Sequence, residues 1–208
     1  MPFNTPEGDV LCYRLGVRLS VCLSVCPLAI SLPLCNSWRI SKKPDTNVYQ
    51  TETMCRSNVL DGWIQGHGLA IYSKSSFTFG PCIETRDVEA TVFSVQQRPD
   101  VVIVFIYKSP KVSSKALLDL LQQIQTKYVK STKAVLLGDF NIDWTSESFE
   151  KHALEKLMTH KLHYRQAIKG PTTDYNTTID LIFTNIQTYK CGIMEAYYTD
   201  HKLCWIGW

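Results

Sequence analysis

The chain has 208 residues, the length of one domain that is large enough to bury a hydrophobic core. Hydrophobic residues make up 45% of it and charged residues 20%, a balance that excludes a disordered or fibrous chain. The formal net charge of +3 allows a polyanionic partner but is too small to indicate a basic nucleic-acid-binding surface. Charge therefore does not distinguish a nucleic-acid substrate from a small phosphate ester.

The eight cysteines show no pattern of a disulfide framework or a zinc site. No C-x-x-C pair occurs, and no cluster of cysteine and histidine has zinc-ligand spacing. We interpret them as buried or incidental thiols. Reduced thiols favour an intracellular protein.

Residues 1–45 differ in composition from the rest of the chain. A four-residue repeat, LSVC, occurs twice in residues 19–26, and an apolar stretch interrupted by Pro27 and Pro33 follows. We interpret residues 1–45 as a low-complexity leader outside the fold and residues 46–208 as one domain. A secretory leader or anchor is a second interpretation, and a native element of the fold is a third. The prolines interrupt the stretch too much for a membrane span, so no membrane partner is expected.

Hydrophobic patterning predicts a series of strands after residue 68. The continuous apolar runs predict strands buried on both faces, and the alternating run predicts a half-buried one. The strands are expected at residues 69–72, 88–95, 101–106, 134–137 and 192–198. We interpret two acidic residues near the alternating run as face residues of a hairpin, Glu84 and Glu89.

Two amphipathic helices are predicted between these strands. Ser113 or Ser114 can cap the first. Its apolar stripe consists of Leu117, Leu118, Leu121, Ile124 and Tyr128. The stripe of the second consists of Phe149, Ala153 and Leu157. Three histidines nearby share no face at ligand spacing, and we interpret them as surface residues: His152, His160 and His163.

The most informative stretch is residues 134–144, AVLLGDFNIDW. An apolar strand runs into Gly138, and polar groups just past such a strand lie at a sheet edge, where ligands bind. On an extended backbone Asp139 and Asn141 point the same way, while Phe140 anchors the other face. A carboxylate beside a carboxamide suits activation of water at a phosphate. The alternative is that the two residues only form the turn after the strand.

Two later segments favour the catalytic interpretation. Asp180 lies inside the apolar run of residues 178–183, where an unpaired charge would be unfavourable. Thr199, Asp200 and His201 then supply a second carboxylate and an imidazole. A buried aspartate beside a histidine fixes the tautomer of the imidazole and stabilises its cation.

In this order, these segments resemble the endonuclease/exonuclease/phosphatase superfamily of DNase I-like fold, and most of all the endonuclease domains of non-LTR retrotransposons. Residues 68–72 resemble the family's GGxAIY strand, residues 107–110 its YRPP segment, and residues 171–180 its PTR…STID stretch. The resemblance covers roughly residues 66–203. It implies an α/β sandwich of two mostly antiparallel sheets with helices outside, missing part of its N-terminal region.

The resemblance also implies catalytic roles in the hydrolysis of a phosphodiester by in-line attack of water. Asp139 would orient or deprotonate the water, and Asn141 would hold the water and a phosphate oxygen. His201, oriented by Asp180, would donate to the pentacovalent phosphate. Tyr107 would donate a further hydrogen bond from another side.

A divalent cation, Mg²⁺ or Mn²⁺, is the cofactor that the resemblance implies. Glu52, within a TET segment, and Asp200 are the candidates for its direct and water-mediated contacts. The family's early phosphate-binding asparagine has two weak candidates, Asn36 and Asn47, and is left unassigned.

Three functions remain open from the sequence. The first is a DNA endonuclease of retroelement origin, which would act on DNA in the nucleus without an obligate protein partner. The second is a phosphatase on the same scaffold. The third is a truncated and inactive relic.

Overall fold

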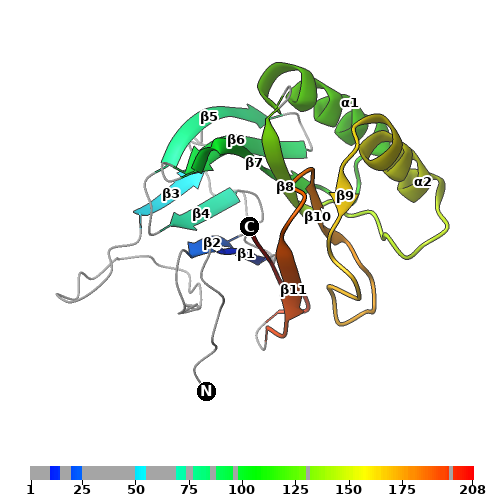
Figure 1. Ribbon diagram of the computed structural model, residues 1–208. Coiled ribbons are helices and arrows are strands. Elements are labelled where there is room, and N and C mark those ends of the chain that lie inside the picture. The colour runs from blue at the N-terminus through cyan, green and yellow to red at the C-terminus, as the bar shows by residue number, and fades with distance from the viewer. Residues whose placement is uncertain are drawn as a thin grey trace, which may run out of the picture.

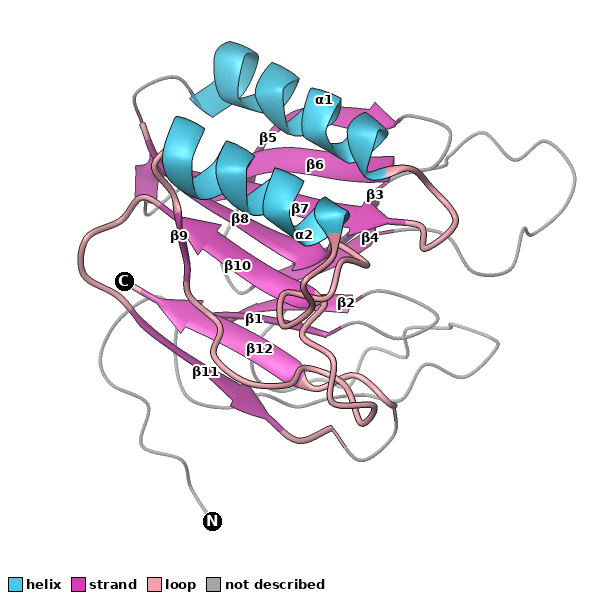
Figure 2. Cartoon of the chain, turned by 90° about the vertical axis from the view of Figure 1, so that its right-hand side faces the viewer, coloured by secondary structure: helices cyan, strands magenta, loops and turns pink. Residues whose placement is uncertain are grey.

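Two six-stranded sheets lie face to face, and two helices cover the outer face of one of them (Figures 1 and 2). The computed structural model describes residues 10–14, 20–24, 50–54, 69–73, 77–84, 88–95, 98–129, 132–196 and 199–208. The predicted α/β sandwich of two mostly antiparallel sheets is confirmed.

The helix-covered sheet has the strand order β5-β6-β7-β8-β10-β9. Its strands are β5 Phe77–Glu84, β6 Val88–Val95, β7 Arg98–Lys108, β8 Lys133–Asp139, β10 Asp180–Thr184 and β9 Arg165–Gln166. All neighbours pair antiparallel except β7 and β8, which are parallel. A parallel pair needs a long crossover, and the first helix provides it.

The second sheet has the strand order β11-β12-β1-β2-β4-β3. Its strands are β11 Lys190–Met194, β12 Leu203–Gly207, β1 Val10–Arg14, β2 Ser20–Ser24, β4 Leu69–Ser73 and β3 Gln50–Met54. β2 and β4 pair in parallel and the other neighbours antiparallel.

Two segments of the expected leader therefore lie between β12 and β4. These segments contain no proline, so their backbone can pair on both sides, whereas Pro27 and Pro33 lie outside the described residues. The domain boundary near residue 46 stays a prediction.

The first helix, α1 Ser114–Ile124, continues as a π-helical turn, η1 Gln125–Val129. Ser113 is its N-cap residue, as expected, but its side chain makes no capping hydrogen bond. The fully buried positions are Leu117, Leu120, Leu121 and Ile124. Leu120 thus takes the place that the sequence assigned to Leu118, which is half-buried.

The second helix, α2 Phe149–Glu155, continues as η2 Lys156–Lys161. Ser148 caps it by accepting a hydrogen bond from the backbone N–H of Lys151 at 3.2 Å. The predicted apolar stripe is wrong at Phe149, which is 85% exposed. The stripe is right at Leu157, which is buried with Leu154 and Met158, because the spacing of these three residues places them on one side of the helix.

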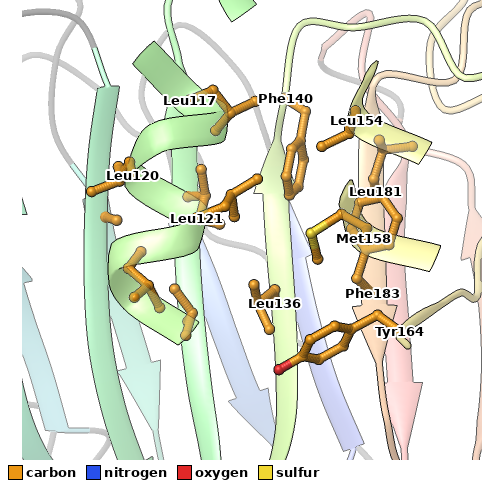
Figure 3. Close-up of a cluster of buried hydrophobic side chains, with 14 of the residues drawn as sticks. Leu117, Leu120, Leu121, Leu136, Phe140, Leu154, Met158, Tyr164, Leu181 and Phe183 are labelled. Atoms are coloured by element: carbon orange, nitrogen blue, oxygen red, sulfur yellow. The ribbon is translucent and has the colours of Figure 1, made fainter. Parts of the chain in front are cut away.

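The core has two layers. One lies between the sheets, and the other lies between the helices and the covered sheet (Figure 3). Phe140 belongs to the helix-side layer and meets the ring of Phe183 edge to face at 5.5 Å. The prediction that Phe140 anchors the face opposite the site is therefore confirmed. Among the described residues, no helix has the length and apolar character needed to cross a membrane.

Gly138 meets a spatial requirement just before Asp139. Its φ of +146° lies in a region that favours glycine, and a Cβ there would lie 1.7 Å from the carbonyl oxygen of Ile106 on β7. The close approach of β8 to β7 therefore depends on this glycine.

Candidate active site

Three side chains form a row across neighbouring strands of the covered sheet. Tyr107 on β7 is in register with Asp139 on β8, and Asp139 is in register with Asp180 on β10. Side chains at registered positions point to the same face of a sheet. This face is the one between the sheets, since Tyr107 packs against the inter-sheet cluster.

Asn141 holds Asp139 with two hydrogen bonds. Its backbone N–H donates to Oδ1 at 2.8 Å, and its amide Nδ2 donates to Oδ2 at 2.9 Å. Nδ2 also donates to the backbone oxygen of Lys108 at 2.8 Å, so both amide hydrogens have acceptors. These bonds fix the amide, and its oxygen remains available as an acceptor.

The backbone reaches this geometry differently from the expectation. β8 ends at Asp139, and Asn141 has a left-handed φ of +45°. The expected extended alternation through Asn141 is therefore wrong, because the chain turns back to let Asn141 cap the Asp139 carboxylate. The sequence offered two alternatives for Asp139 and Asn141, a pair of polar site residues or a turn after the strand. In the structure the same two residues form both the polar pair and the turn.

Asp139 has an electrostatic environment suited to proton transfer. Its side chain is buried, and burial together with the charge of Asp180 raises its pKa to about 7. The hydrogen bond from Asn141 and the charges of His201 and Lys108 oppose this rise. A carboxylate with a pKa near neutral pH can accept a proton at that pH and later release it.

Asp180 orients His201. Asp180 is fully buried, and Nδ1 of His201 lies 3.0 Å from its Oδ2 and 3.2 Å from its Oδ1. Burial raises the pKa of Asp180, and its hydrogen bond with His201 offsets part of that rise. With Nδ1 committed to Asp180, Nε2 is the ring nitrogen that can face a substrate.

The same carboxylate raises the basicity of the imidazole. Burial alone would lower the pKa of His201, but the hydrogen bond that Nδ1 donates to Asp180 and the charges of Asp180, Asp139 and Asp200 outweigh burial and raise it. A histidine of this kind is a good proton donor near neutral pH.

The loop before β10, which the sequence assigned no role in the site, holds Asp180 and His201 in place. Thr172 Oγ1 accepts hydrogen bonds from the backbone N–H groups of Ile179 and Asp180, both at 3.1 Å. The backbone oxygen of Thr172 accepts a hydrogen bond from the backbone N–H of Lys202 at 2.7 Å. Thr173 forms an isolated antiparallel β-bridge with His201. The only sequence signal was the position of Thr172 within the PTR-like stretch.

Tyr107 and Lys108 lie at the end of β7. Burial, followed by the charges of Asp139 and Glu89, raises the pKa of Tyr107, so its hydroxyl remains a hydrogen-bond donor. Lys108, which sequence reasoning missed, is 1% exposed, and its ammonium donates to the backbone oxygen of Ser109 at 3.2 Å. Burial lowers the pKa of Lys108, and the charges of Glu150 and Asp139 offset part of the change.

Glu89, expected to be a hairpin face residue, is buried and in register with Tyr107.

The two candidate metal ligands are less closely defined. Asp200 is exposed and directly precedes His201, and its charge adds to the effect of Asp180 and Asp139 in raising the pKa of His201. Glu52 lies on β3, in register with Ile71 of β4, and its side chain is outside the described part of the structure. The early asparagine candidates, Asn36 and Asn47, are likewise outside it. Within the described residues, no three acidic, histidine or cysteine side chains converge as a metal site. Oxygen donors such as Glu52 and Asp200 nonetheless have the chemistry that Mg²⁺ or Mn²⁺ requires.

Solved structures with the same fold include phosphatases and related enzymes. The 3′ phosphatase NExo from Neisseria, bound to a product DNA hairpin, is 18% identical with a TM-score of 0.51, over 76% of this chain and 78% of that one. An endonuclease/exonuclease/phosphatase from Bacteroides vulgatus is 15% identical with a TM-score of 0.52, over 76% and 75%. The mannosyl-6-phosphatase of Bacteroides thetaiotaomicron is 14% identical with a TM-score of 0.50, over 76% of each chain. At these identities the likeness concerns the fold.

The sequence comparisons are more specific. No curated protein matches the chain significantly. The family model described as "Endonuclease-reverse transcriptase" matches residues 101–204, half of the chain, and this segment contains Tyr107, Asp139, Asp180 and His201. The family is a class of metal-dependent phosphodiesterases, phosphatases and nucleases. The chain therefore belongs to the endonuclease/exonuclease/phosphatase family of the DNase I-like superfamily.

Proposed function

We propose that this protein is a metal-dependent nuclease that hydrolyses a phosphodiester bond of DNA, and that it derives from a retroelement endonuclease. The observation that carries the proposal is that Asn141 holds Asp139, that Asp139 is in register with Asp180, and that Asp180 holds His201. Such an arrangement would supply a proton acceptor and a proton donor to one phosphate.

Each side chain has a distinct role in this proposal. Asp139 accepts the proton of the attacking water, because its pKa of about 7 allows it to be ionised near neutral pH. Asn141 orients that water with its amide oxygen. His201, held by Asp180, donates from Nε2 to the phosphate oxygen that gains negative charge. Tyr107 donates from the neighbouring strand.

Glu52 and Asp200 would hold a divalent cation, Mg²⁺ or Mn²⁺. When bound, the cation would neutralise charge on the phosphate and the leaving oxygen. Asp200 supports this role because it directly precedes His201 in the chain and is exposed.

Phosphatase activity is the second candidate, because two of the solved structures that share the fold are phosphatases by name. A plasmid-nicking assay beside a phosphomonoester assay, each with Mg²⁺ or Mn²⁺, separates the two activities. We expect nicking to dominate.

Asp139→Ala and His201→Ala test the site itself. Removal of one such group typically lowers the rate about 10²–10³-fold, so both variants should lose nicking while circular dichroism shows an intact fold. His160→Ala, which removes an exposed histidine of η2, should nick at the wild-type rate. Wild-type rates in either site variant would refute the assignment, and an inactive wild-type protein would favour the relic.

A further inference from the structure

A groove of about 480 Å³ lies outside the row of catalytic residues. Its walls are η2, the short strand β9, and the segments that follow β8 and β9, and its lining includes Trp144, Arg165, Gln166, Lys169 and Thr178. A volume in this range accommodates a nucleotide-sized group. None of the roles proposed above uses this groove.

The charge of the groove favours an anion. Arg165 and Lys169 are exposed, and within the described residues neither forms an ion pair with a carboxylate. One nitrogen of Arg165 donates to the side-chain oxygen of Gln187 at 3.1 Å, which orients the guanidinium. The acidic side chain of the lining, Glu155, is already paired with Lys151 at 2.7 Å. The uncompensated charge of the groove is therefore positive.

A buried donor in the groove wall lacks an acceptor. The amide nitrogen Nε2 of Gln166 is inaccessible to solvent and makes no hydrogen bond within the described part of the chain. Because this atom is closed to solvent, an anion in the groove cannot reach it either, and the donors open to a ligand are those of Arg165 and Lys169.

The groove is joined to the catalytic strand. Thr178 donates from Oγ1 to the backbone oxygen of Gly170 at 2.9 Å, and its own N–H donates to Asp143 at 2.9 Å. Thr178 precedes Asp180 by two residues, so their Cα atoms are no more than about 7 Å apart. The segment that lines the groove also carries Thr172, which holds the backbone of Asp180.

The groove is poorly suited to stacking on a base. The ammonium of Lys151 lies over the Trp144 ring, 5.5 Å from its centroid, and the edge of the indole meets Phe183. The accessible groups of the groove are thus cationic or polar, and these are the groups that contact a phosphate backbone.

We propose that Arg165 and Lys169 form a phosphate site that binds the backbone of a nucleic acid beyond the scissile phosphate. This inference rests on the proposed nuclease function and extends it, because it names residues that hold the substrate outside the reacting groups. The contact is independent of base sequence and positions the strand rather than specifying the target.

The test is the salt dependence of binding to a short DNA duplex, measured by fluorescence anisotropy without divalent metal. Arg165→Gln with Lys169→Gln should lower the magnitude of the slope of log K against log salt by about 1.8, the value for two phosphate contacts. Hydrolysis of a small phosphodiester, which cannot reach the groove, should keep the wild-type rate. The control is Lys127→Gln with Lys161→Gln, which removes two exposed lysines of η1 and η2 and should change the slope much less.

Each other outcome overturns the proposal. An unchanged slope in the groove variant, or an equal decrease in the control, shows that the groove holds no phosphate. A matching loss on the small ester shows that the residues act through the catalytic groups. If the groove variant fails to fold, Lys169→Gln alone should lower the magnitude of the slope by about half as much. The proposal is then overturned if Lys169→Gln leaves the slope unchanged. A wild-type protein that does not bind DNA refutes the nuclease function as well, whereas binding with an unchanged slope refutes the groove alone.

Discussion

Asp139 shows how a single residue can serve a local turn and a catalytic site together. Its carboxylate accepts both the backbone N–H and the amide of Asn141, which closes the turn after β8. The same bonds orient Asn141 beside the proton acceptor. The GDFN motif identifies Asp139 and Asn141 as site residues. Their relative orientation is set by the positive φ of Asn141 and by the hydrogen bond from its amide to the carbonyl of Lys108.

The raised pKa of Asp139 predicts a pH-dependent stability. Its ordinary value is 3.8, whereas burial and the charge of Asp180 raise the folded value to about 7. The folded chain therefore binds more protons than the unfolded chain between these values, and stability falls as the pH rises from about 4 to about 7. Asp139→Asn cannot titrate, so its free energy of unfolding relative to wild type should increase across this range, as measured by urea denaturation without metal.

Asp143→Asn is the matched control. Burial would raise the pKa of Asp143, but hydrogen bonds from Thr178 and Thr145 outweigh burial and lower it. The stability that Asp143 contributes is then lost only as the pH falls below its ordinary range, so the control should show no trend from about pH 4 to pH 7. A flat difference for Asp139→Asn as well would show that Asp139 has an ordinary pKa.

Among the elements, α2 shows best where sequence periodicity is misleading. Phe149, Ala153 and Leu157 have helical spacing, yet only Leu157 of these is buried, together with Leu154 and Met158 (Figure 3). Phe149 is the first residue of the helix and is exposed. Spacing alone gives several stripes on a short helix, and the position of the sheet selects one.

Paired substitutions in α2 test this assignment. Leu154→Ala should destabilise the fold by about 2–5 kcal/mol, because it opens a cavity in the helix-side core. Phe149→Ala should change stability by no more than about 0.5 kcal/mol, although it removes a larger side chain. Chemical denaturation measures both, and a larger effect at Phe149 would contradict the burial described here.

At the scale of the whole molecule, the site is shared by the two sheets. Tyr107, Asp139 and Asp180 come from the covered sheet, whereas His201 immediately precedes β12 of the other sheet. Glu52 lies on β3, at the edge of that second sheet. The active geometry therefore depends on how the two sheets pack against each other.

Thermal denaturation with and without Mg²⁺ or Mn²⁺ tests the metal assignment. A cation at about 100 times its dissociation constant should stabilise the folded protein by about 2.7 kcal/mol. Glu52→Gln and Asp200→Asn should reduce this effect, and Asp119→Asn, on the exposed face of α1, should not. If Mg²⁺ or Mn²⁺ stabilises Glu52→Gln as much as it stabilises the wild-type protein, Glu52 is not a ligand of the cation.

The sequence by itself determined the local parts of this protein. The apolar runs of β7 and β8 and the glycine before Asp139 were sufficient to predict strands and a turn, because strand pattern and turn chemistry depend on neighbouring residues. The order of the GDFN, TIDLIF and TDH segments carried the family resemblance, and that resemblance implied the sandwich. Only the tertiary structure decided which face of α2 is buried, how Lys108 and Thr172 hold the site, and where Arg165 and Lys169 form a groove. These features depend on contacts between residues distant in the chain, and no local pattern encodes them.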